Sequence, residues 1–111
     1  MNLSQQAHGS ANLVKLPNRL VMANATETRK ALLTLVEQGR NRLILDLNKV
    51  EFIDSSGLSV LVSALKAAQN DAGEVLLLSP NDGVRSLIEL TRLHQVFEIF
   101  EDRDAAIQRL S

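Results

Sequence analysis

The stretch RLILDLNKVEFIDSSGLSVLVSAL, residues 42–65, contains the pattern that decides the fold. Its first six residues, 42–47, form a short and nearly continuous apolar run, which is typical of a strand buried on both faces of a sheet. Residues 48–53 then lead into a turn at Asp54. The first half of the stretch therefore predicts a buried central strand that ends in a turn.

The second half of the same stretch is amphipathic with a helical period. Its apolar side chains recur at a spacing of i, i+3, i+4 and i+7, and the side chains on the opposite face are polar. The apolar positions are Leu58, Leu61, Val62 and Leu65, and the polar positions are Ser59, Ser63, Lys66 and Asn70. This pattern predicts a helix with one face packed in the core and the other in solvent.

The alternation of strand and helix patterns extends in both directions. Asn24 and Glu27 resemble a helix-capping pair, and helical spacing continues from there to Gly39. Toward the C-terminus the predicted elements are a strand over 74–79, a helix over 84–90, a short edge strand over 97–100 and a final helix capped by Asp102.

Strands that alternate with helices at these distances predict crossover connections and a mainly parallel sheet. Near the N-terminus, the runs 13–16 and 19–22 flank the turn-forming pair Pro17-Asn18 and predict an antiparallel hairpin. The predicted fold class is therefore α/β, a single domain with a mixed, mainly parallel β-sheet, an N-terminal hairpin and about four helices.

The chain has 111 residues, which fits one domain that can bury a core without metals or disulfides. Residues 1–12 are polar and contain Gly9 and Ser10. We therefore expect a flexible N-terminal tail over 1–12 and the domain over 13–111.

Composition excludes several classes of function. The formal net charge is -1, from 12 basic and 13 acidic residues, so no general attraction draws the chain to nucleic acid or anionic lipid. No apolar run approaches the ~20 residues of a membrane helix, and the polar start lacks a secretion signal. The sequence contains no cysteine, which fits a reducing compartment. We expect a cytoplasmic protein that binds neither nucleic acid nor membrane.

Two adjacent hydroxyl residues, Ser55 and Ser56, stand at the predicted helix start, between Asp54 and Gly57. A helix N-terminus exposes unpaired backbone N–H groups and the positive end of the macrodipole, so a phosphate there gains donors and favourable charge. Phosphorylation would add about -1.5 to -2 charges beside Asp54 and repel a tightly fitted partner. Gly57 would let such a partner approach the backbone closely. The turn is a candidate phosphorylation site on a docking surface.

Helix capping alone also accounts for this string. Asp54 or Ser55 can be a simple N-cap, and Gly57 can be an accommodation to packing, because Ser and Asp cap helices in proteins of every kind. From these residues alone, both interpretations stay open.

A catalytic interpretation has little support in the pattern. Neither His8 nor His94 stands at metal-ligand spacing from a second ligand, and no motif places either as the base of a serine hydrolase. No Gly-rich phosphate loop precedes a Lys-Ser or Lys-Thr pair. We therefore expect no catalytic residue, no metal and no cofactor.

The layout from about Leu13 to Leu110 resembles the STAS domains (sulfate transporter and anti-sigma factor antagonist), in particular the free-standing bacterial anti-sigma factor antagonists. The matching segments are LPNRL (16–20), LILDL (43–47), VEFIDSSGL (50–58), VRSLIELT (84–91) and VFEIF (96–100). One departure is Thr91-Arg92-Leu93, where the family often has Gly in the middle. Arg92 is therefore predicted to end the third helix without the usual left-handed Gly, at some cost in strain.

The resemblance implies a partner-switching regulator that is not an enzyme. In that scheme the unphosphorylated antagonist binds an anti-sigma factor that is also a serine kinase, or a related regulatory protein. Phosphorylation of the Ser after the Asp blocks binding, and a PP2C-type phosphatase resets the switch. By that match Ser55 is the phosphoacceptor and Ser56 its alternative.

The partner-binding surface is then expected to comprise Asp54, Ser55, Ser56, Gly57, Leu58, Ser59 and Ser63. The alternative that the sequence leaves open is a STAS docking or scaffold subunit of a transport or signalling complex, in which Ser55 is never modified.

Overall fold

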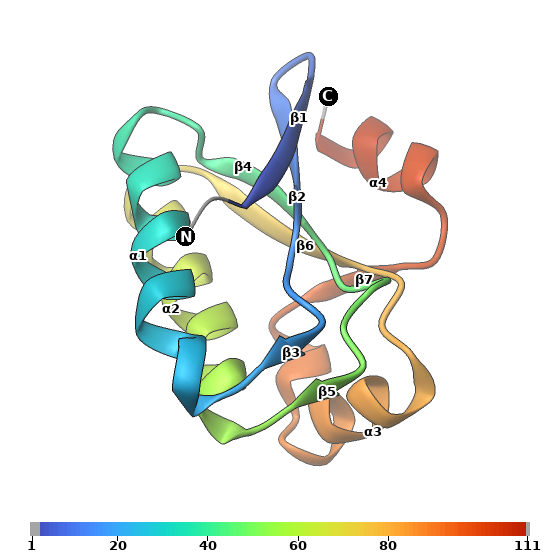
Figure 1. The fold of residues 1–111 in the computed structure, drawn as a ribbon. Helices are drawn as coiled ribbons and strands as arrows, with labels where there is room; N and C mark the ends of the chain where they lie inside the picture. Colours follow the sequence, from blue (N-terminus) through green and yellow to red (C-terminus); the bar gives the residue numbers. More distant parts are fainter. Residues whose placement is uncertain (1–2, 111) are drawn as a thin grey trace.

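The computed structural model describes residues 3–110 and shows a β-sheet with helices on both faces (Figure 1). In chain order the elements are β1 (Ser4–His8), β2 (Ala11–Lys15), β3 (Arg19–Leu20), α1 (Met22–Glu37), β4 (Arg42–Asp46), β5 (Phe52–Ile53), α2 (Ser55–Asn70), β6 (Glu74–Leu78), α3 (Asp82–Leu90), the 3-10 helix η1 (Leu93–Gln95), β7 (Glu98–Phe100) and α4 (Arg103–Leu110).

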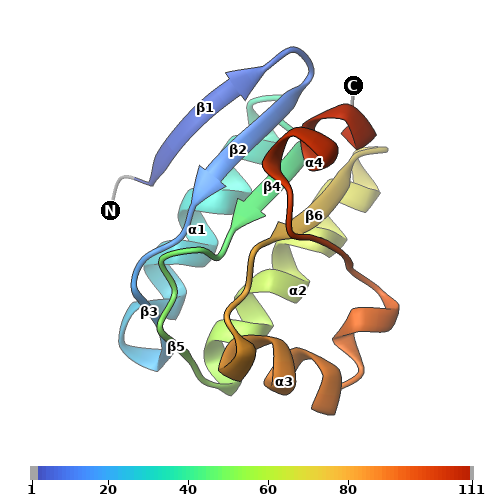
Figure 2. The same cartoon turned by 90° about the vertical axis from the view of Figure 1, so that its right-hand side faces the viewer.

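The main sheet has five strands in the order β1-β2-β4-β6-β7. The β1–β2 pair is antiparallel and the other pairs are parallel. Figure 2 shows α1 and α2 on one face of this sheet, α4 on the opposite face, and α3 at one end. Strands β3 and β5 form a separate two-stranded parallel sheet, in which Leu20 stands opposite Ile53. This small sheet leads directly into the starts of α1 and α2.

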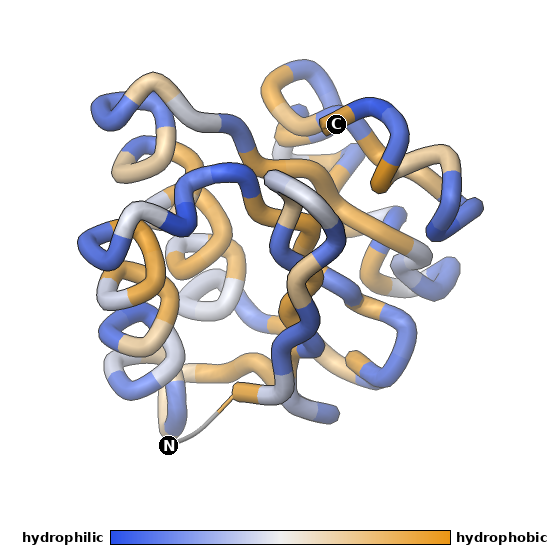
Figure 3. The backbone as a smooth tube through the Cα atoms, turned by 90° about the horizontal axis from the view of Figure 1, so that it is seen from above, coloured by the Kyte–Doolittle hydropathy of each residue, from blue (hydrophilic) through white to orange (hydrophobic). Residues whose placement is uncertain are grey.

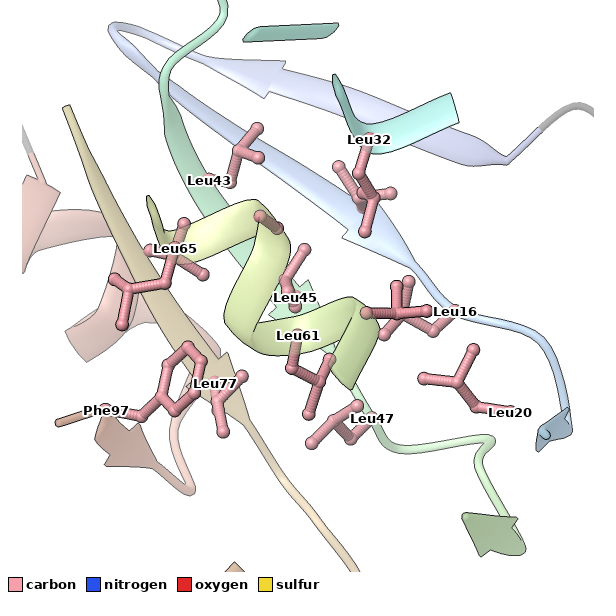
Figure 4. Packing of buried hydrophobic residues seen from close by; sticks show 14 of the residues in the cluster. Leu16, Leu20, Leu32, Leu43, Leu45, Leu47, Leu61, Leu65, Leu77 and Phe97 are labelled. Carbon is pink, nitrogen blue, oxygen red and sulfur yellow. The ribbon is translucent and has the colours of Figure 1, made fainter. Parts of the chain in front are cut away.

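Aliphatic side chains fill both sides of the main sheet. The larger cluster lies between the sheet and the helices α1 and α2, and Figure 4 shows Leu61 of α2 there together with Leu45 and Leu77 of the strands. Ile44, between Leu43 and Leu45 on β4, belongs instead to the smaller cluster beneath α4, because successive strand residues point to opposite faces. In Figure 3 the hydrophobic segments accordingly run through the middle of the molecule.

The structure confirms the predicted fold class, α/β with a mixed, mainly parallel sheet, an N-terminal antiparallel hairpin and, among residues 3–110, four α-helices. The hairpin is not where it was predicted, however. The run 13–16 does not pair with 19–22: β2 pairs antiparallel with β1, and Arg19–Leu20 runs parallel to β5. Pro17-Asn18 therefore carries the chain from the main sheet to the small one and does not fold it back.

The flexible tail predicted over 1–12 is wrong for the part that the structure describes. Residues Ser4–His8 form β1, and Gly9 and Ser10 make the two-residue turn into β2. Gly9 has φ 63, as expected where glycine takes the first position of a tight hairpin turn. Strand β1 lies at the sheet edge with largely exposed polar side chains, so its sequence lacks the alternation that marks a strand. Residues 1 and 2 lie outside the described residues.

Three helix ends can be compared with the predicted ends: the start of α1, the end of α3 and the start of α4. Helix α1 begins at Met22, earlier than predicted, because the Asn24 side chain accepts the Val21 N–H at 3.0 Å and so closes the first turn from inside the helix. Arg92 has φ 60, which confirms the predicted left-handed residue after α3. The carboxylate of Asp102 accepts the Asp104 N–H at 3.4 Å at the start of α4, as expected of a cap.

Candidate functional site

Asp54 stands at the junction of β5 with α2 and caps that helix. Its Oδ1 accepts the Gly57 N–H at 2.9 Å, and its backbone carbonyl accepts the Leu58 N–H at 3.0 Å. The backbone of Asp54 is extended, as an N-cap requires. These bonds fix the first turn of α2, so the side chains that follow Asp54 are presented from a rigid helix start.

The second oxygen of the same carboxylate reaches another helix. Asp54 Oδ2 accepts the N–H of Met22, the first residue of α1, at 3.0 Å. The Asp54 N–H in turn donates to the Leu20 carbonyl at 3.2 Å, which continues the pairing of β3 with β5. One carboxylate therefore satisfies unpaired backbone donors at the starts of two helices and ties those starts together.

The backbone donors around Asp54 lower the pKa of its carboxyl group. The hydrogen bond from the Gly57 N–H has the largest effect, desolvation opposes it, and the N–H groups of Met22 and Ser56 lower the pKa further. The group is therefore ionised at neutral pH, with its charge at the positive ends of α1 and α2.

Ser55 is the first residue of α2 and its side chain is exposed, whereas Ser56 is half-buried. Within residues 3–110 neither hydroxyl makes a hydrogen bond to another side chain or to the backbone. Both oxygens of the adjacent Asp54 carboxylate are engaged with Gly57 and Met22. Ser55 therefore offers a free hydroxyl to solvent.

Gly57 and Leu58 face the interior and not the surface. A Cβ on Gly57 would lie 2.1 Å from the Leu20 carbonyl oxygen and 2.6 Å from Cγ1 of Ile53. Leu58 is 7% exposed and belongs to the main core cluster. Gly57 thus serves the close packing of α2 on the small sheet, as the capping interpretation allows. Both residues must be removed from the predicted contact surface.

Further along α2, Ser59 is exposed one turn after Ser55, and Ser63 is half-buried in the following turn. Residues one turn apart share a helix face, so Ser55 and Ser59 are neighbours on the surface. The structure therefore brings together Asp54, Ser55, Ser56 and Ser59 as the accessible part of the predicted surface, with Ser63 at its margin.

Two exposed apolar side chains flank the turn, and no pattern in the sequence marked them as part of the site. Met22 is 76% exposed and Phe52 is 48% exposed. The guanidinium group of Arg19 lies over the Phe52 ring, 5.0 Å from its centroid, because Arg19 stands opposite Phe52 in the β3–β5 pair. A large apolar residue such as Phe52 is expected in the core by default, so only its proximity to Asp54 could have marked it as a surface residue.

The two histidines lie on other elements. His8 is on β1, with Nε2 2.9 Å from a guanidinium nitrogen of Arg103, and His94 is in η1. Over residues 3–110 there is no group of three His, Cys, Asp or Glu side chains arranged to hold a metal ion. Over the same residues no helix combines the length and apolar character needed to cross a membrane.

The mixed-sheet α/β fold and the exposed serine after the Asp cap of α2 match what the resemblance to STAS domains implies. The family model described as the STAS domain matches residues 2–106, and the chain belongs to this family.

Individual relatives agree with this assignment. A Thermotoga maritima protein named as an anti-sigma factor antagonist is 31% identical over 100 residues, which cover 88% of this chain and 88% of the relative. The crystal structure of an anti-sigma factor antagonist from the same organism superimposes with a TM-score of 0.91 at 28% identity, over 97% of this chain and 93% of the other.

A more distant structure shares the fold. The phosphorylated form of the Bacillus cell fate determinant SpoIIAA superimposes with a TM-score of 0.77 at 20% identity, over 99% of this chain and 100% of the other. Homologues named as anti-sigma factor antagonists support a partner-switching role. The antagonists form a family of regulatory domains without enzymatic activity.

Proposed function

We propose that this chain is a phosphorylation-controlled partner-switching regulator, whose unphosphorylated form binds a serine kinase of the anti-sigma factor kind or a related regulatory protein. Phosphorylation of Ser55 blocks that binding. The observation that carries the proposal is the exposed, unbonded Ser55 hydroxyl at the first position of α2, directly after the capping Asp54. A kinase can reach this hydroxyl without unfolding the helix.

Ser55 is preferred to Ser56 as the acceptor because of its accessibility. The Ser55 side chain is exposed, and Ser56, at the second helical position, is half-buried. A kinase must enclose the attacking hydroxyl and place it in line with the transferred phosphoryl group, which a half-buried side chain resists.

The local electrostatics favour a change of surface chemistry over refolding. The Asp54 carboxylate already accepts the Gly57 and Met22 N–H groups, so those two donors are not available to a phosphate on Ser55. The phosphate would instead project outward and add about -1.5 to -2 charges beside an ionised carboxylate. A partner shaped to the unmodified turn would then meet both added bulk and unpaired negative charge.

The phosphorylation cycle also requires a kinase and a phosphatase. The chain itself performs no catalysis, the kinase is the partner or is associated with it, and a PP2C-type phosphatase removes the phosphate. The accessible face for the partner is Asp54, Ser55, Ser56 and Ser59, with Ser63 at its margin.

Phosphorylation by candidate kinases tests the proposal. The purified chain is incubated with ATP and each anti-sigma-type serine kinase of its source organism, and intact mass spectrometry is followed by peptide mapping. We expect one phosphate on Ser55, its loss in Ser55→Ala, and its retention in the matched control Ser56→Ala. The kinase should bind the unmodified chain and not the phosphorylated chain.

Two outcomes reject the switch. If none of the kinases modifies Ser55, or if modified and unmodified chains bind the same kinase equally, phosphorylation does not control partner choice. Stable binding by both forms would favour the alternative, a docking or scaffold subunit in which Ser55 has no regulatory part.

A further inference from the structure

Two exposed apolar side chains lie on segments that adjoin Asp54. Met22 is 76% exposed and Phe52 is 48% exposed, in a chain whose other large apolar side chains are mostly buried. Met22 is held by the hydrogen bond from its N–H to Asp54, and Phe52 precedes Asp54 by two residues. Both anchors therefore lie beside the turn on a rigid backbone, which limits the entropy lost when a partner covers them.

Phe52 is one of only three aromatic residues in the chain, all of them phenylalanine. Phe97 is 2% exposed and Phe100 is half-buried. Exposing the ring of Phe52 forgoes part of the stabilisation that burial of a phenylalanine gives. Exposed aromatic residues on rigid elements are common centres of protein interfaces.

Arg19 supplies the charge of this face. Its guanidinium group lies over the Phe52 ring, and among residues 3–110 it makes no ion pair with a carboxylate. The nearby Asp54 carboxylate is occupied by backbone donors of α1 and α2. Arg19, held in position by its stacking on Phe52, therefore offers an incoming partner an unpaired positive charge beside the ring.

We propose that Met22 and Phe52 are the apolar anchors of the partner interface and that Arg19 selects a carboxylate beside the partner's apolar pocket. The occupant is thus a second protein that offers an apolar pocket with an acidic side chain at its rim. This inference rests on the proposed function in taking the face around Ser55 as the docking face. It adds the chemistry by which that face recognises its partner.

Selection from random peptides displayed on phage tests this chemistry without knowledge of the partner. The immobilised wild-type chain should enrich peptides in which large apolar residues adjoin Asp or Glu. In titrations with a selected synthetic peptide, Phe52→Ala and Met22→Ala should each weaken binding at least tenfold. The matched control Val96→Ala truncates another exposed apolar side chain, 56% exposed and between η1 and β7, and should leave binding unchanged.

The charge is tested with the same peptide. Arg19→Glu should weaken binding more at low than at high salt, whereas Lys30→Glu on the exposed side of α1 should have little effect. Arg19→Lys should retain part of the binding, because lysine keeps the charge and loses the planar guanidinium group that stacks on Phe52. Thermal melts verify that each variant is folded.

Three peptide results overturn the inference: no enrichment, enriched peptides without acidic residues, or selected peptides that bind Phe52→Ala as well as wild type. Self-association of the wild type that Phe52→Ala abolishes, measured by sedimentation, would assign the face to a second copy and also overturn it. The peptide results do not depend on phosphorylation of Ser55. Failure here is therefore distinguishable from failure of the switch, which the kinase assay detects.

Discussion

The Met22 backbone N–H donates to Asp54 Oδ2 across 3.0 Å, so the residue that caps α2 also holds the first residue of α1. The two residues are 32 positions apart in the chain. The link places an exposed apolar side chain, a carboxylate and the Ser55 hydroxyl in one fixed arrangement. Any change at Asp54 is therefore expected to affect both helices.

Replacement of Asp54 tests this double role. Asp54→Ala should lower the midpoint of urea unfolding more than Asp102→Ala, because Asp102 accepts one long bond at the start of α4 alone. The unfolding midpoint of Asp54→Asn should lie between the midpoints of wild type and Asp54→Ala. The amide keeps one acceptor oxygen, but its NH2 group then faces a backbone N–H group that the carboxylate had accepted. Equal midpoints for the two alanine variants would show that the bond to Met22 contributes nothing.

Acid should remove the contribution of this carboxylate. Its pKa is lowered in the folded chain, chiefly by the Gly57 N–H, so folding favours the ionised form. The resulting stability is fully present above the unfolded pKa, about 4. It is lost as the pH falls through the lower folded pKa.

Unfolding of wild type and Asp54→Asn across a pH series provides the measurement. The difference in free energy of unfolding should be constant from neutral pH down to about 5 and should shrink below about 4. A difference that stays constant in strong acid would contradict the assigned role of the charge.

Packing at Gly57 gives a third prediction. In Gly57→Ala the new Cβ would meet the Leu20 carbonyl oxygen at 2.1 Å, so α2 must move away from the small sheet, at a cost of about 1–3 kcal/mol. Gly83→Ala in α3 is the matched control, because its Cβ would meet nothing closer than 3.6 Å. That control should be neutral or stabilising by up to about 1 kcal/mol, since alanine favours helix over glycine. Similar losses in both variants would refute the packing role of Gly57.

Arg92 offers a stabilising change. Its φ of 60 is left-handed, a conformation that costs a residue with a side chain about 1 kcal/mol and glycine almost nothing. Arg92→Gly should therefore raise the free energy of unfolding by about 0.5–1 kcal/mol, partly offset by the greater freedom of glycine in the unfolded chain. Arg29→Gly within α1 should instead lower it by about 1 kcal/mol. A loss at both positions would exclude relief of backbone strain at Arg92.

Periodic elements could be predicted from the sequence, and tertiary links could not. Strand β4 and helix α2 carry apolar patterns that burial imposes on them, and both lie where the pattern indicated. Strand β1 was missed because an exposed edge strand, Ser4–His8, is under no such requirement and is fixed by its turn and its ladder to β2.

In the candidate site, too, local features could be predicted from the sequence and tertiary contacts could not. Local chemistry predicted that Asp54 or Ser55 caps the helix, because capping involves neighbours in sequence, and the structure assigns the cap to Asp54. Gly57 was ambiguous until its contact with the Leu20 carbonyl was seen. The exposure of Met22 and Phe52 depends on how β3 pairs with β5, and no local pattern in the sequence encodes that pairing.

The two faces of α2 provide the last prediction. Leu61 is fully buried between α2 and the sheet, so Leu61→Ala should cost about 2–5 kcal/mol of unfolding free energy through lost burial and the cavity that remains. Ser59→Glu adds a larger, charged side chain on the exposed face and should change stability by less than about 0.5 kcal/mol. The same Ser59→Glu change should weaken binding of the unphosphorylated chain to its kinase, because Ser59 adjoins Ser55 on the accessible face. A large stability loss from Ser59→Glu would show that this side of α2 is packed and not exposed. Kinase binding that Ser59→Glu leaves intact would show that the partner does not use this face of α2.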